Sequence, residues 1–273
     1  MLFRSMVKHP EYPTATKDPW QLPYASRPTQ EDLKNQGVQA RTGYTVQQTT
    51  KHWFVNDLEH PYIETKRFDW MRGYHVGGRS IMWGRQSYRW SPMDFEANAK
   101  DGIAVDWPIR YNDLEKWYDY VETFAGISGQ AEGLAQLPDG KFLPPMELNC
   151  VEREFKNVLK SKFGRAMTIG RTAHATAPLP HSPQRGTCQF RNMCSRGCPY
   201  GGYFSSNAST IPAAEATGNM TLRPNSVVYE LIYDEQKGKA TGVKVLDDVT
   251  GETMEFYARV IFLCASKIGR AHV

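Results

Sequence analysis

Glycines and arginines are concentrated between Arg72 and Arg89, in the segment RGYHVGGRSIMWGRQSYR. The four glycines of this segment fall within twelve positions and are Gly73, Gly77, Gly78 and Gly84. Glycine at this density indicates backbone that bends sharply or lies against a ligand. Arginines, backbone amides and an aromatic wall such as Trp83 suit a planar, charged cofactor. The residues alone leave a second interpretation open, an ordinary glycine-rich loop with solvated arginines, because glycine motifs are weak on their own.

Three cysteines make a second cluster of reactive side chains, in the stretch CQFRNMCSRGCPYGGYF. The pattern C-x5-C-x3-C-Pro is formed by Cys188, Cys194 and Cys198. Thiolates with His174 or His181 suit zinc, but structural zinc sites usually have shorter C-x2-4-C spacings. A disulfide, an iron–sulfur cluster and structural cysteines without a metal are the other interpretations. Cys150 and Cys264 stand in apolar helix and strand contexts and are predicted to be inert core residues.

The composition excludes several classes of function. The chain has 273 residues, of which 40% are hydrophobic and 23% charged, as in ordinary globular proteins. The net charge of +4 is too small and too dispersed to indicate nucleic-acid binding. No run is long and apolar enough to span a membrane. The histidines at 9, 52, 60 and 75 lack metal-ligand spacing and are predicted to be packing or surface residues.

Capping residues predict four helices that position these segments. A helical turn is expected around Thr29 to Gln36, with Thr29 and Asp32 as a capping box. After Trp107-Pro108-Ile109, a helix capped by Asn112 or Asp113 should be ended by Gly126 and Gly129, and Asn149 with Glu152 should cap the next. Thr210 is predicted to cap the last helix, with Pro212 in its first turn and Gly218 after its end.

Apolar stripes predict which faces of two of these helices are buried. The first stripe consists of Leu114, Trp117, Tyr118, Val121 and Phe124, and the second of Val151, Phe155, Val158 and Leu159. Both stripes have helical spacing, so both are expected to pack in the core. A sugar-stacking surface is the less favoured interpretation of the aromatic stripe.

Alternating residues near the end of the chain predict an antiparallel meander. Its strands are expected at 227–233, 241–246 and 252–258, with turns at 235–238 and 247–251. The following run 260–264, VIFLC, is apolar throughout, which is typical of a buried strand in a parallel sheet.

The glycine segment resembles the flavin-contacting loop of the glucose–methanol–choline (GMC) oxidoreductases. Gly77, Gly78, Ser80 and Trp83 match the Gly-Gly-x-Ser-x-x-Trp run that lies against FAD in that family. The likeness is greatest to the sugar-oxidising branch, which comprises pyranose oxidases and the flavoprotein subunits of glucose, gluconate and glucoside dehydrogenases. It implies that Arg79, Met82 and Gly84 also contact FAD. Met82 stands where pyranose oxidases have a histidine bonded to the flavin, so FAD is expected to bind non-covalently.

The resemblance also implies a fold. The implied fold belongs to the α/β class with α+β character. The chain would contain a discontinuous part of a glutathione-reductase-type FAD-binding fold with a β-meander, and in addition part of a substrate domain. Residues 1–95 and 205–266 are assigned to the FAD-binding domain, and residues 96–204 to a substrate or cap region with the cysteine-rich turn. Val228 before the meander and Ala265 after it match positions that contact FAD in the family.

The cysteine stretch resembles a loop that binds a three-iron cluster in bacterial FAD-dependent glucose dehydrogenases. Cys188, Cys194, Cys198 and Pro199 align with that loop, but Gln189 replaces an additional cysteine. This difference favours structural cysteines without a metal over an iron–sulfur cluster.

The ends of the chain indicate a fragment. No Gly-x-Gly-x-x-Gly turn for the FAD pyrophosphate occurs. The last six residues, IGRAHV at 268–273, match one reading frame of a sequencing adapter, so residues 267–273 are expected to be an artefact, with a genuine terminus as the alternative. The family oxidises CH–OH to C=O by hydride transfer to flavin N5, with a histidine as base. That histidine is expected beyond Ser266, so no catalytic residue is assigned. The fragment is expected to be inactive and to bind FAD poorly.

A sugar or polyol substrate and a small subunit or cytochrome as electron acceptor are the expected partners. The compartment, cytoplasm or periplasm, stays open. The alternative function is a small metal-binding or interaction module built on the cysteine turn.

Overall fold

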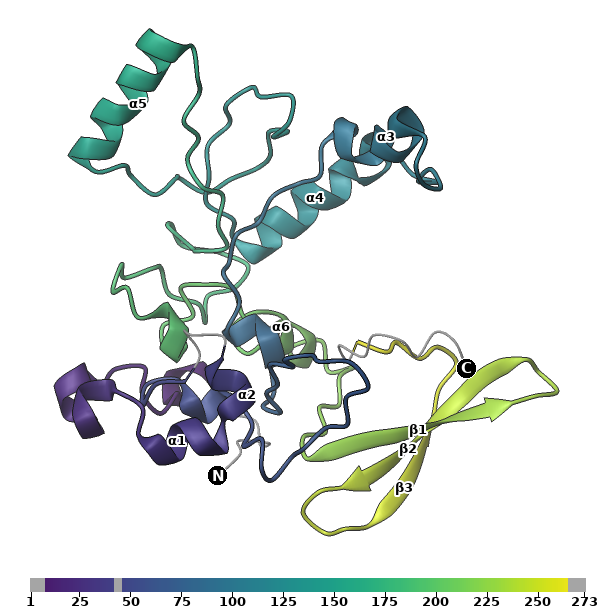
Figure 1. Cartoon of the computed structure of the whole chain (residues 1–273). Helices are drawn as coiled ribbons and strands as arrows, with labels where there is room; N and C mark the ends of the chain where they lie inside the picture. The colour runs from purple at the N-terminus through teal and green to yellow at the C-terminus, as the bar shows by residue number, and fades with distance from the viewer. Residues whose placement is uncertain (1–7, 42–45, 265–273) are drawn as a thin grey trace. The chain divides into compact units, whose positions relative to one another are not determined.

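Residues 8–41 and 46–264 are described by the computed structural model, in which the chain forms two compact units, Met1–Met220 and Thr221–Val273. The helices lie in the first unit (Figure 1) and are α1 (Gln30–Asn35), α2 (Gly37–Ala40), α3 (Pro92–Asp101), α4 (Tyr111–Ala125), α5 (Cys150–Phe163) and α6 (Thr210–Glu215). Short 3₁₀ turns cover His9–Glu11, Pro19–Gln21, Pro23–Ser26, Lys51–Trp53, Gly78–Ile81 and Cys194–Arg196. The strands lie in the second unit and are β1 (Ser226–Asp234), β2 (Lys239–Asp247) and β3 (Thr253–Tyr257). Mixed helices and a small antiparallel sheet agree with the predicted fold class at this coarse level.

Reciprocal capping boxes begin two of the predicted helices. At α1 the Asp32 N–H donates to Thr29 Oγ1 at 3.0 Å, and the Thr29 N–H donates to Asp32 Oδ2 at 2.9 Å. At α5 the Asn149 and Glu152 pair does the same, with distances of 2.9 and 2.8 Å. Because each box satisfies two N–H groups that have no partner within the helix, both starts were predictable from sequence.

The predicted starts of the other two helices were wrong by one to three residues. The cap of α4 is Arg110, and Asp113 is the third residue inside, where its carboxylate accepts the Arg110 N–H at 2.8 Å. The cap of α6 is Ser209, so Thr210 is the first helical residue. An acidic residue at the third position stabilises the same end of a helix as a cap does, which is why Asp113 was misread.

The predicted burial of both apolar stripes was wrong in part, because four residues of the stripes are exposed and the other five are only half-buried. On α4, Trp117 and Val121 are 56% and 58% exposed, and the buried residues are Tyr111, Glu122 and Ala125. The helix turns this other side inward because Glu122 forms an ion pair with the buried Arg89. Helix α5 has no buried residue, and Val151 and Phe155 are exposed. Spacing identified the apolar faces but could not show what packs on them.

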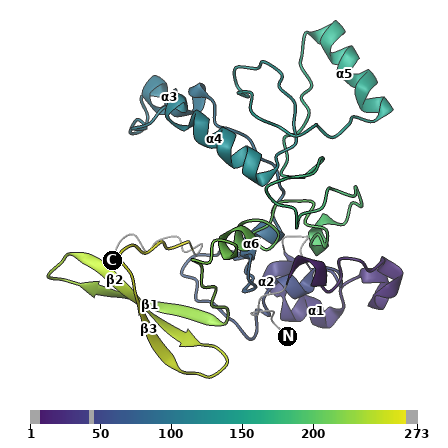
Figure 2. The same ribbon diagram turned by 180° about the vertical axis from the view of Figure 1, so that it is seen from behind.

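The second unit is the predicted meander. Its strands pair antiparallel in the order β1-β2-β3, with Val228 opposite Val245 and Val245 opposite Met254 (Figure 1). Figure 2 shows the same three twisted strands from behind. Val245 is buried on the central strand, whereas Val228 is 43% exposed on an outer one. The period-two pattern therefore predicted the number, order and direction of these strands correctly.

The prediction of a buried strand at 260–264 was wrong. Residues 261–264 have no regular structure, and Val260, Phe262 and Leu263 are exposed. An apolar run becomes a buried strand only where it has parallel neighbours, and the sheet of the described residues is the antiparallel meander alone. Cys150 and Cys264 are exposed as well, so the prediction that they are core residues was also wrong.

Two small clusters of buried side chains lie within the first unit. One consists of Tyr12, Ala15, Trp53, Phe54 and Ile81, and the other of Ala125, Ile127 and Ala173. Buried arginines accompany them, namely Arg72, Arg85, Arg89, Arg171 and Arg185. Four of these guanidinium groups donate hydrogen bonds to backbone carbonyls, and the fifth, that of Arg89, pairs with Glu122 instead.

Two histidines that pack against Trp53 make the stability of this unit sensitive to acid. The rings of His52 and His75 lie 4.4 and 4.8 Å from the Trp53 ring, and burial lowers the pKa of each to about 4. The folded state therefore favours the neutral imidazoles, and the stability they contribute is complete above about pH 6.5. It is lost as the pH falls from about 6.5 towards 4.

We expect the urea midpoint of unfolding, followed by tryptophan fluorescence, to fall over this pH window. His75→Gln keeps a donor for the Gly78 carbonyl, which lies 3.0 Å from His75 Nε2, but cannot titrate, so it should reduce the fall. His181→Gln, at an exposed histidine, is the matched control and should retain it. A midpoint independent of pH in the unsubstituted protein would contradict this account.

Candidate functional site

The glycine segment forms a left-handed turn followed by one 3₁₀ turn. Gly77 has φ +91° and Gly78 has φ +48°. A Cβ on Gly77 would lie 1.8 Å from Asn207 Oδ1, so this glycine is needed for close packing as well as for its backbone angle. At Gly78 and Gly84 a Cβ would meet nothing within 4 Å. The turn is thus packed on one side and open on the other. We call residues 77–84 the glycine turn.

Side chains of the glycine turn attach it to the segment 203–207. Ser80 Oγ donates to the Gly77 carbonyl at 2.6 Å and accepts the Ser206 N–H at 2.9 Å. Trp83 Nε1 donates to the Phe204 carbonyl at 3.0 Å. Met82 is half-buried against the cluster that contains Trp53 and Ile81. Ser80, Met82 and Trp83 therefore hold the shape of the turn, in addition to any contact they make with a ligand.

The sequence suggested that the arginines of the segment 72–89 bind a charged cofactor, but most of them bond to other groups of the protein. Arg72 donates to the His60 carbonyl at 2.6 Å, and Arg89 pairs with Glu122. Arg79 is exposed. Arg72, Arg85 and Arg89 are buried and bonded to protein groups, so Arg79 is the arginine of this segment best placed to meet a solvent-borne anion.

The predicted cofactor residues fall into three groups. Gly77, Gly78, Arg79, Ser80, Met82, Trp83 and Gly84 are together on the glycine turn of the first unit. Val228 lies on β1 of the second unit. Ala265 lies outside the residues that the structure describes.

Sequence reasoning missed a direct connection between the glycine turn and the cysteine stretch. Arg85 Nη2 donates to the Ile81 carbonyl at 3.1 Å and to the Cys194 carbonyl at 2.8 Å. The guanidinium lies 4.1 Å from the centre of the Tyr203 ring, and Tyr203 Oη donates to the Ile81 carbonyl at 2.8 Å. Residues more than a hundred positions apart thus share one bonding network. No sequence signal predicts it, because the glycine-rich and cysteine-rich patterns do not indicate which residues of the two segments contact each other.

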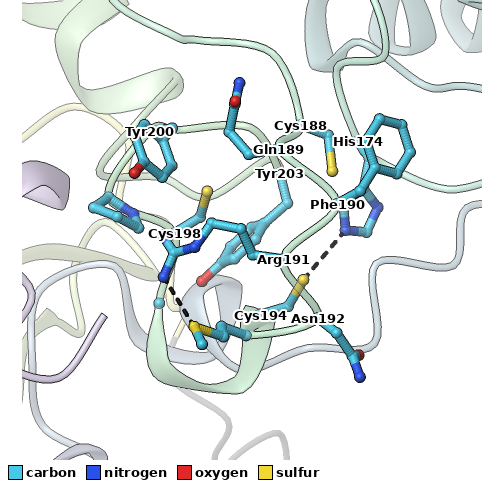
Figure 3. Close-up of a pocket in the computed structure, with 13 residues that line it drawn as sticks. His174, Cys188, Gln189, Phe190, Arg191, Asn192, Cys194, Cys198, Tyr200 and Tyr203 are labelled. Atoms are coloured by element: carbon cyan, nitrogen blue, oxygen red, sulfur yellow. Dashed lines mark hydrogen bonds between the residues drawn. The ribbon is translucent and has the colours of Figure 1, made fainter. Parts of the chain in front are cut away.

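One small pocket, with a free volume of about 30 Å³, is lined by Cys188, Cys194 and Cys198 (Figure 3). We call it the cysteine pocket. Its lining residues are His174, Cys188, Gln189, Phe190, Arg191, Asn192, Met193, Cys194, Gly197, Cys198, Pro199, Tyr200 and Tyr203. The sequence analysis named His174 and His181 as neighbours of the cysteines. His174 lies in the pocket, whereas His181 Nε2 lies 3.0 Å from the Phe124 carbonyl.

His174 connects the pocket thiols to the backbone. Its Nε2 lies 3.8 Å from Cys194 Sγ, and its Nδ1 lies 2.7 Å from Thr172 Oγ1 (Figure 3 shows the first contact). Burial lowers the His174 pKa to about 4, and the charges of Arg85 and Arg185 act in the same direction. Burial raises the pKa of Cys194, against which the charge of Arg85 acts to lower it.

The described residues do not gather three histidine, cysteine or acidic side chains in an arrangement that could hold a metal ion. In the cysteine pocket one thiol is engaged by His174, and Cys198 Sγ accepts the Gly202 N–H at 3.3 Å. An iron–sulfur cluster at this turn would need the thiols rearranged. In the same part of the chain, no helix has the length and apolarity to cross a bilayer.

Comparison with known proteins identifies relatives of this chain. It is 29% identical over 200 residues to a 2-methyl-1,2-propanediol dehydrogenase of Mycolicibacterium austroafricanum, covering 71% of this chain and 35% of the relative. It is 28% identical over 184 residues to a fructose dehydrogenase large subunit of Gluconobacter japonicus, covering 63% and 31%. It is 24% identical over 242 residues to a gluconate 2-dehydrogenase flavoprotein of Pantoea cypripedii, covering 78% and 39%.

These relatives are longer proteins, and the matched region is about a third of each. The family profile described as GMC oxidoreductase matches residues 34–273, which include the glycine turn, the cysteine pocket and the meander. Members of that family generally bind FAD. Since the match covers most of the chain and includes the glycine turn whose geometry is described above, the chain belongs to the GMC oxidoreductase family.

Proposed function

We propose that the chain is part of an FAD-dependent oxidoreductase that oxidises CH–OH groups of sugars or related alcohols. Family membership supports the cofactor and the class of reaction. The names of the relatives, which include a diol, a fructose and a gluconate dehydrogenase, support a polyhydroxylated or alcoholic substrate. The observation that carries the proposal is the glycine turn, which is closed against Asn207 at Gly77 and open at Gly78.

The open side of the turn fits a flat ligand. At Gly78 and Gly84 the space that a Cβ would take is free, so a ring system could approach the backbone directly. Arg79 is exposed beside them and would supply positive charge. Ser80 and Trp83 would keep the turn in shape through their bonds to Ser206 and Phe204. FAD bound there supplies the hydride acceptor for oxidation of the alcohol.

The domain assignments extend this proposal. Residues 1–95 and 205–266 would belong to a glutathione-reductase-type FAD-binding domain, and residues 96–204 to the substrate or cap region. Val228 and Ala265 would contribute to FAD binding from the meander side. A separate small subunit or cytochrome would take the electrons.

The test is the flavin content of the product of the complete gene. We expect a yellow protein that absorbs near ~450 nm, as a flavin cofactor does, and is bleached by a sugar or polyol in the absence of an acceptor. Denaturation should release all the colour, because the Met82 thioether cannot form the link that a histidine makes. A colourless protein with bound zinc would instead support the metal-binding module, and colour that stays with the denatured chain would refute non-covalent binding.

For the cysteine turn we propose structural thiols without an iron–sulfur cluster. Gln189 in place of a further cysteine and the contact of His174 with Cys194 support this. Iron and acid-labile sulfide should be absent from anaerobically purified protein. Their presence in cluster stoichiometry would reverse the assignment.

A further inference from the structure

The carbonyl oxygen of Ile81, at the buried end of the glycine turn, accepts hydrogen bonds from two side chains. Arg85 Nη2 donates to it at 3.1 Å, and Tyr203 Oη donates to it at 2.8 Å. All three residues are buried. Ile81 ends the 3₁₀ turn Gly78–Ile81, and carbonyl groups at the end of a helix have no partner within it. The two donors therefore fix this end of the turn, whereas its other side is open at Gly78.

The backbone of Arg85 adopts a conformation that favours glycine. Its φ is +64°, which is uncommon for a residue with a side chain. The Arg85 carbonyl accepts the Ala173 N–H at 2.8 Å, and this bond holds the strained backbone in place. Glycine would adopt the same angle without strain, so the backbone does not account for an arginine at this position.

The guanidinium of Arg85 joins the glycine turn to a second segment of the chain. Its Nη2 carries two protons and donates to the Ile81 carbonyl and, at 2.8 Å, to the Cys194 carbonyl. The group lies 4.1 Å from the centre of the Tyr203 ring, which restricts its plane. One planar group thus holds two backbone carbonyls in fixed relative positions.

The open side of the glycine turn presents backbone to a ligand. A ring system that approaches at Gly78 and Gly84 meets no Cβ atom there. Backbone cannot adapt to a ligand by changing rotamers, so its position has to be set before binding. Ordering a mobile loop on binding weakens affinity, and bonds that order it beforehand strengthen affinity.

We propose that Arg85 and Tyr203 are positioning residues for the flavin. By holding the Ile81 carbonyl, they keep residues 78–83 in the shape that receives the ring system. This inference rests on the proposed function, since FAD is the ligand that it invokes. It requires no contact of either side chain with the cofactor, because both act through the backbone of the turn.

The first test is the affinity of Tyr203→Phe for FAD, measured on the product of the complete gene after its flavin has been removed. The variant keeps the ring beside Arg85 and loses one donor. Arg85 still bonds the Ile81 carbonyl, so the urea midpoint should stay unchanged. We expect the Kd for FAD to rise about three- to tenfold, as for the loss of one hydrogen bond. The visible circular dichroism of the bound flavin should also change, which a purely structural role would not cause.

Arg85→Gly removes the guanidinium and suits the positive φ. The Kd for FAD should rise roughly ten- to a hundredfold, because hydrogen bonds from a charged group are stronger. Arg85→Lys keeps the charge without the planar group, so it should recover only part of the affinity. Tyr88→Phe, at an exposed tyrosine on the segment after the turn, is the matched control and should leave the Kd and the flavin spectrum unchanged.

Hydrogen exchange gives a measurement that needs no cofactor. In the flavin-free protein, the amides of residues 77–84 should exchange faster in Tyr203→Phe and Arg85→Gly than in Tyr88→Phe or the unsubstituted protein. If Arg85→Gly does not fold, Tyr203→Phe decides alone. A yellow unsubstituted protein whose FAD affinity and flavin spectrum survive both substitutions would overturn this inference and leave the proposed function intact. An unsubstituted protein that binds no FAD would overturn both.

Discussion

Gly77→Ala is expected to abolish FAD loading and to destabilise the first unit by about 2–4 kcal/mol. The new Cβ would lie 1.8 Å from Asn207 Oδ1 and 2.8 Å from Asn207 Cγ, so the Asn207 side chain would have to move. The φ of +91° adds strain that any side chain at this position must bear. The two effects act together on the backbone that is proposed to meet the flavin. Two measurements report them: the flavin-to-protein ratio of the purified product of the complete gene, and urea unfolding followed by tryptophan fluorescence.

Gly84→Ala is the matched control for stability on the same turn. Its Cβ would meet nothing within 4 Å, so stability should stay within about 0.5 kcal/mol. Combining Gly77→Ala with Asn207→Ala removes the clash but not the backbone strain, and a double-mutant cycle should therefore show partial recovery. Equal loading of Gly77→Ala and the unsubstituted protein with FAD would remove the structural basis of the proposed function.

Arg89→Met is expected to destabilise the first unit by about 3–5 kcal/mol, the effect of breaking a buried ion pair by removing one partner. Arg89 Nε and Nη2 donate to the two carboxylate oxygens of Glu122 at 2.8 and 2.6 Å. The same guanidinium donates to Asp119 and to the Tyr111 hydroxyl. Without it, the buried carboxylate of Glu122 would lose its counter-charge. The urea midpoint at constant pH is the measurement.

Replacing both partners provides the control for this effect. Arg89→Met with Glu122→Leu leaves no buried charge between α4 and the segment after the glycine turn, so most of the lost stability should return. Arg67→Met removes an exposed pair with Asp69 and should leave the midpoint essentially unchanged. If Arg89→Met were as mild as Arg67→Met, the Arg89 network would not be what fixes α4 in place.

Local signals in the sequence were sufficient for the local structure. The Thr29 and Asn149 capping boxes and the three strands of the meander depend on residues a few positions apart, and they were confirmed. The bend at Gly77 and Gly78 was likewise indicated by glycine itself, and both residues have positive φ.

Helix orientation and side-chain bonding that depend on residues far away in the sequence could not be predicted in this way. Trp117 and Val121 have core-like spacing on α4, but the helix is oriented by the pairing of Glu122 with Arg89, which hydropathy does not record. Arg85 is one of the arginines that suited a charged cofactor in the sequence, and it instead bonds two carbonyls of the protein. In each case a single polar contact over a long sequence separation decided the outcome.

The bond from the Ser206 N–H to Ser80 Oγ joins residues 126 positions apart, and the bond from Arg85 to Cys194 spans 109. Bringing together residues this far apart lowers the conformational entropy of the chain before the stabilising contacts have formed. The glycine turn must therefore reach its final geometry late in folding, whereas the hairpins of the meander can form on their own. All seven tryptophans precede residue 118 and belong to the first unit, so their emission reports on that late closure.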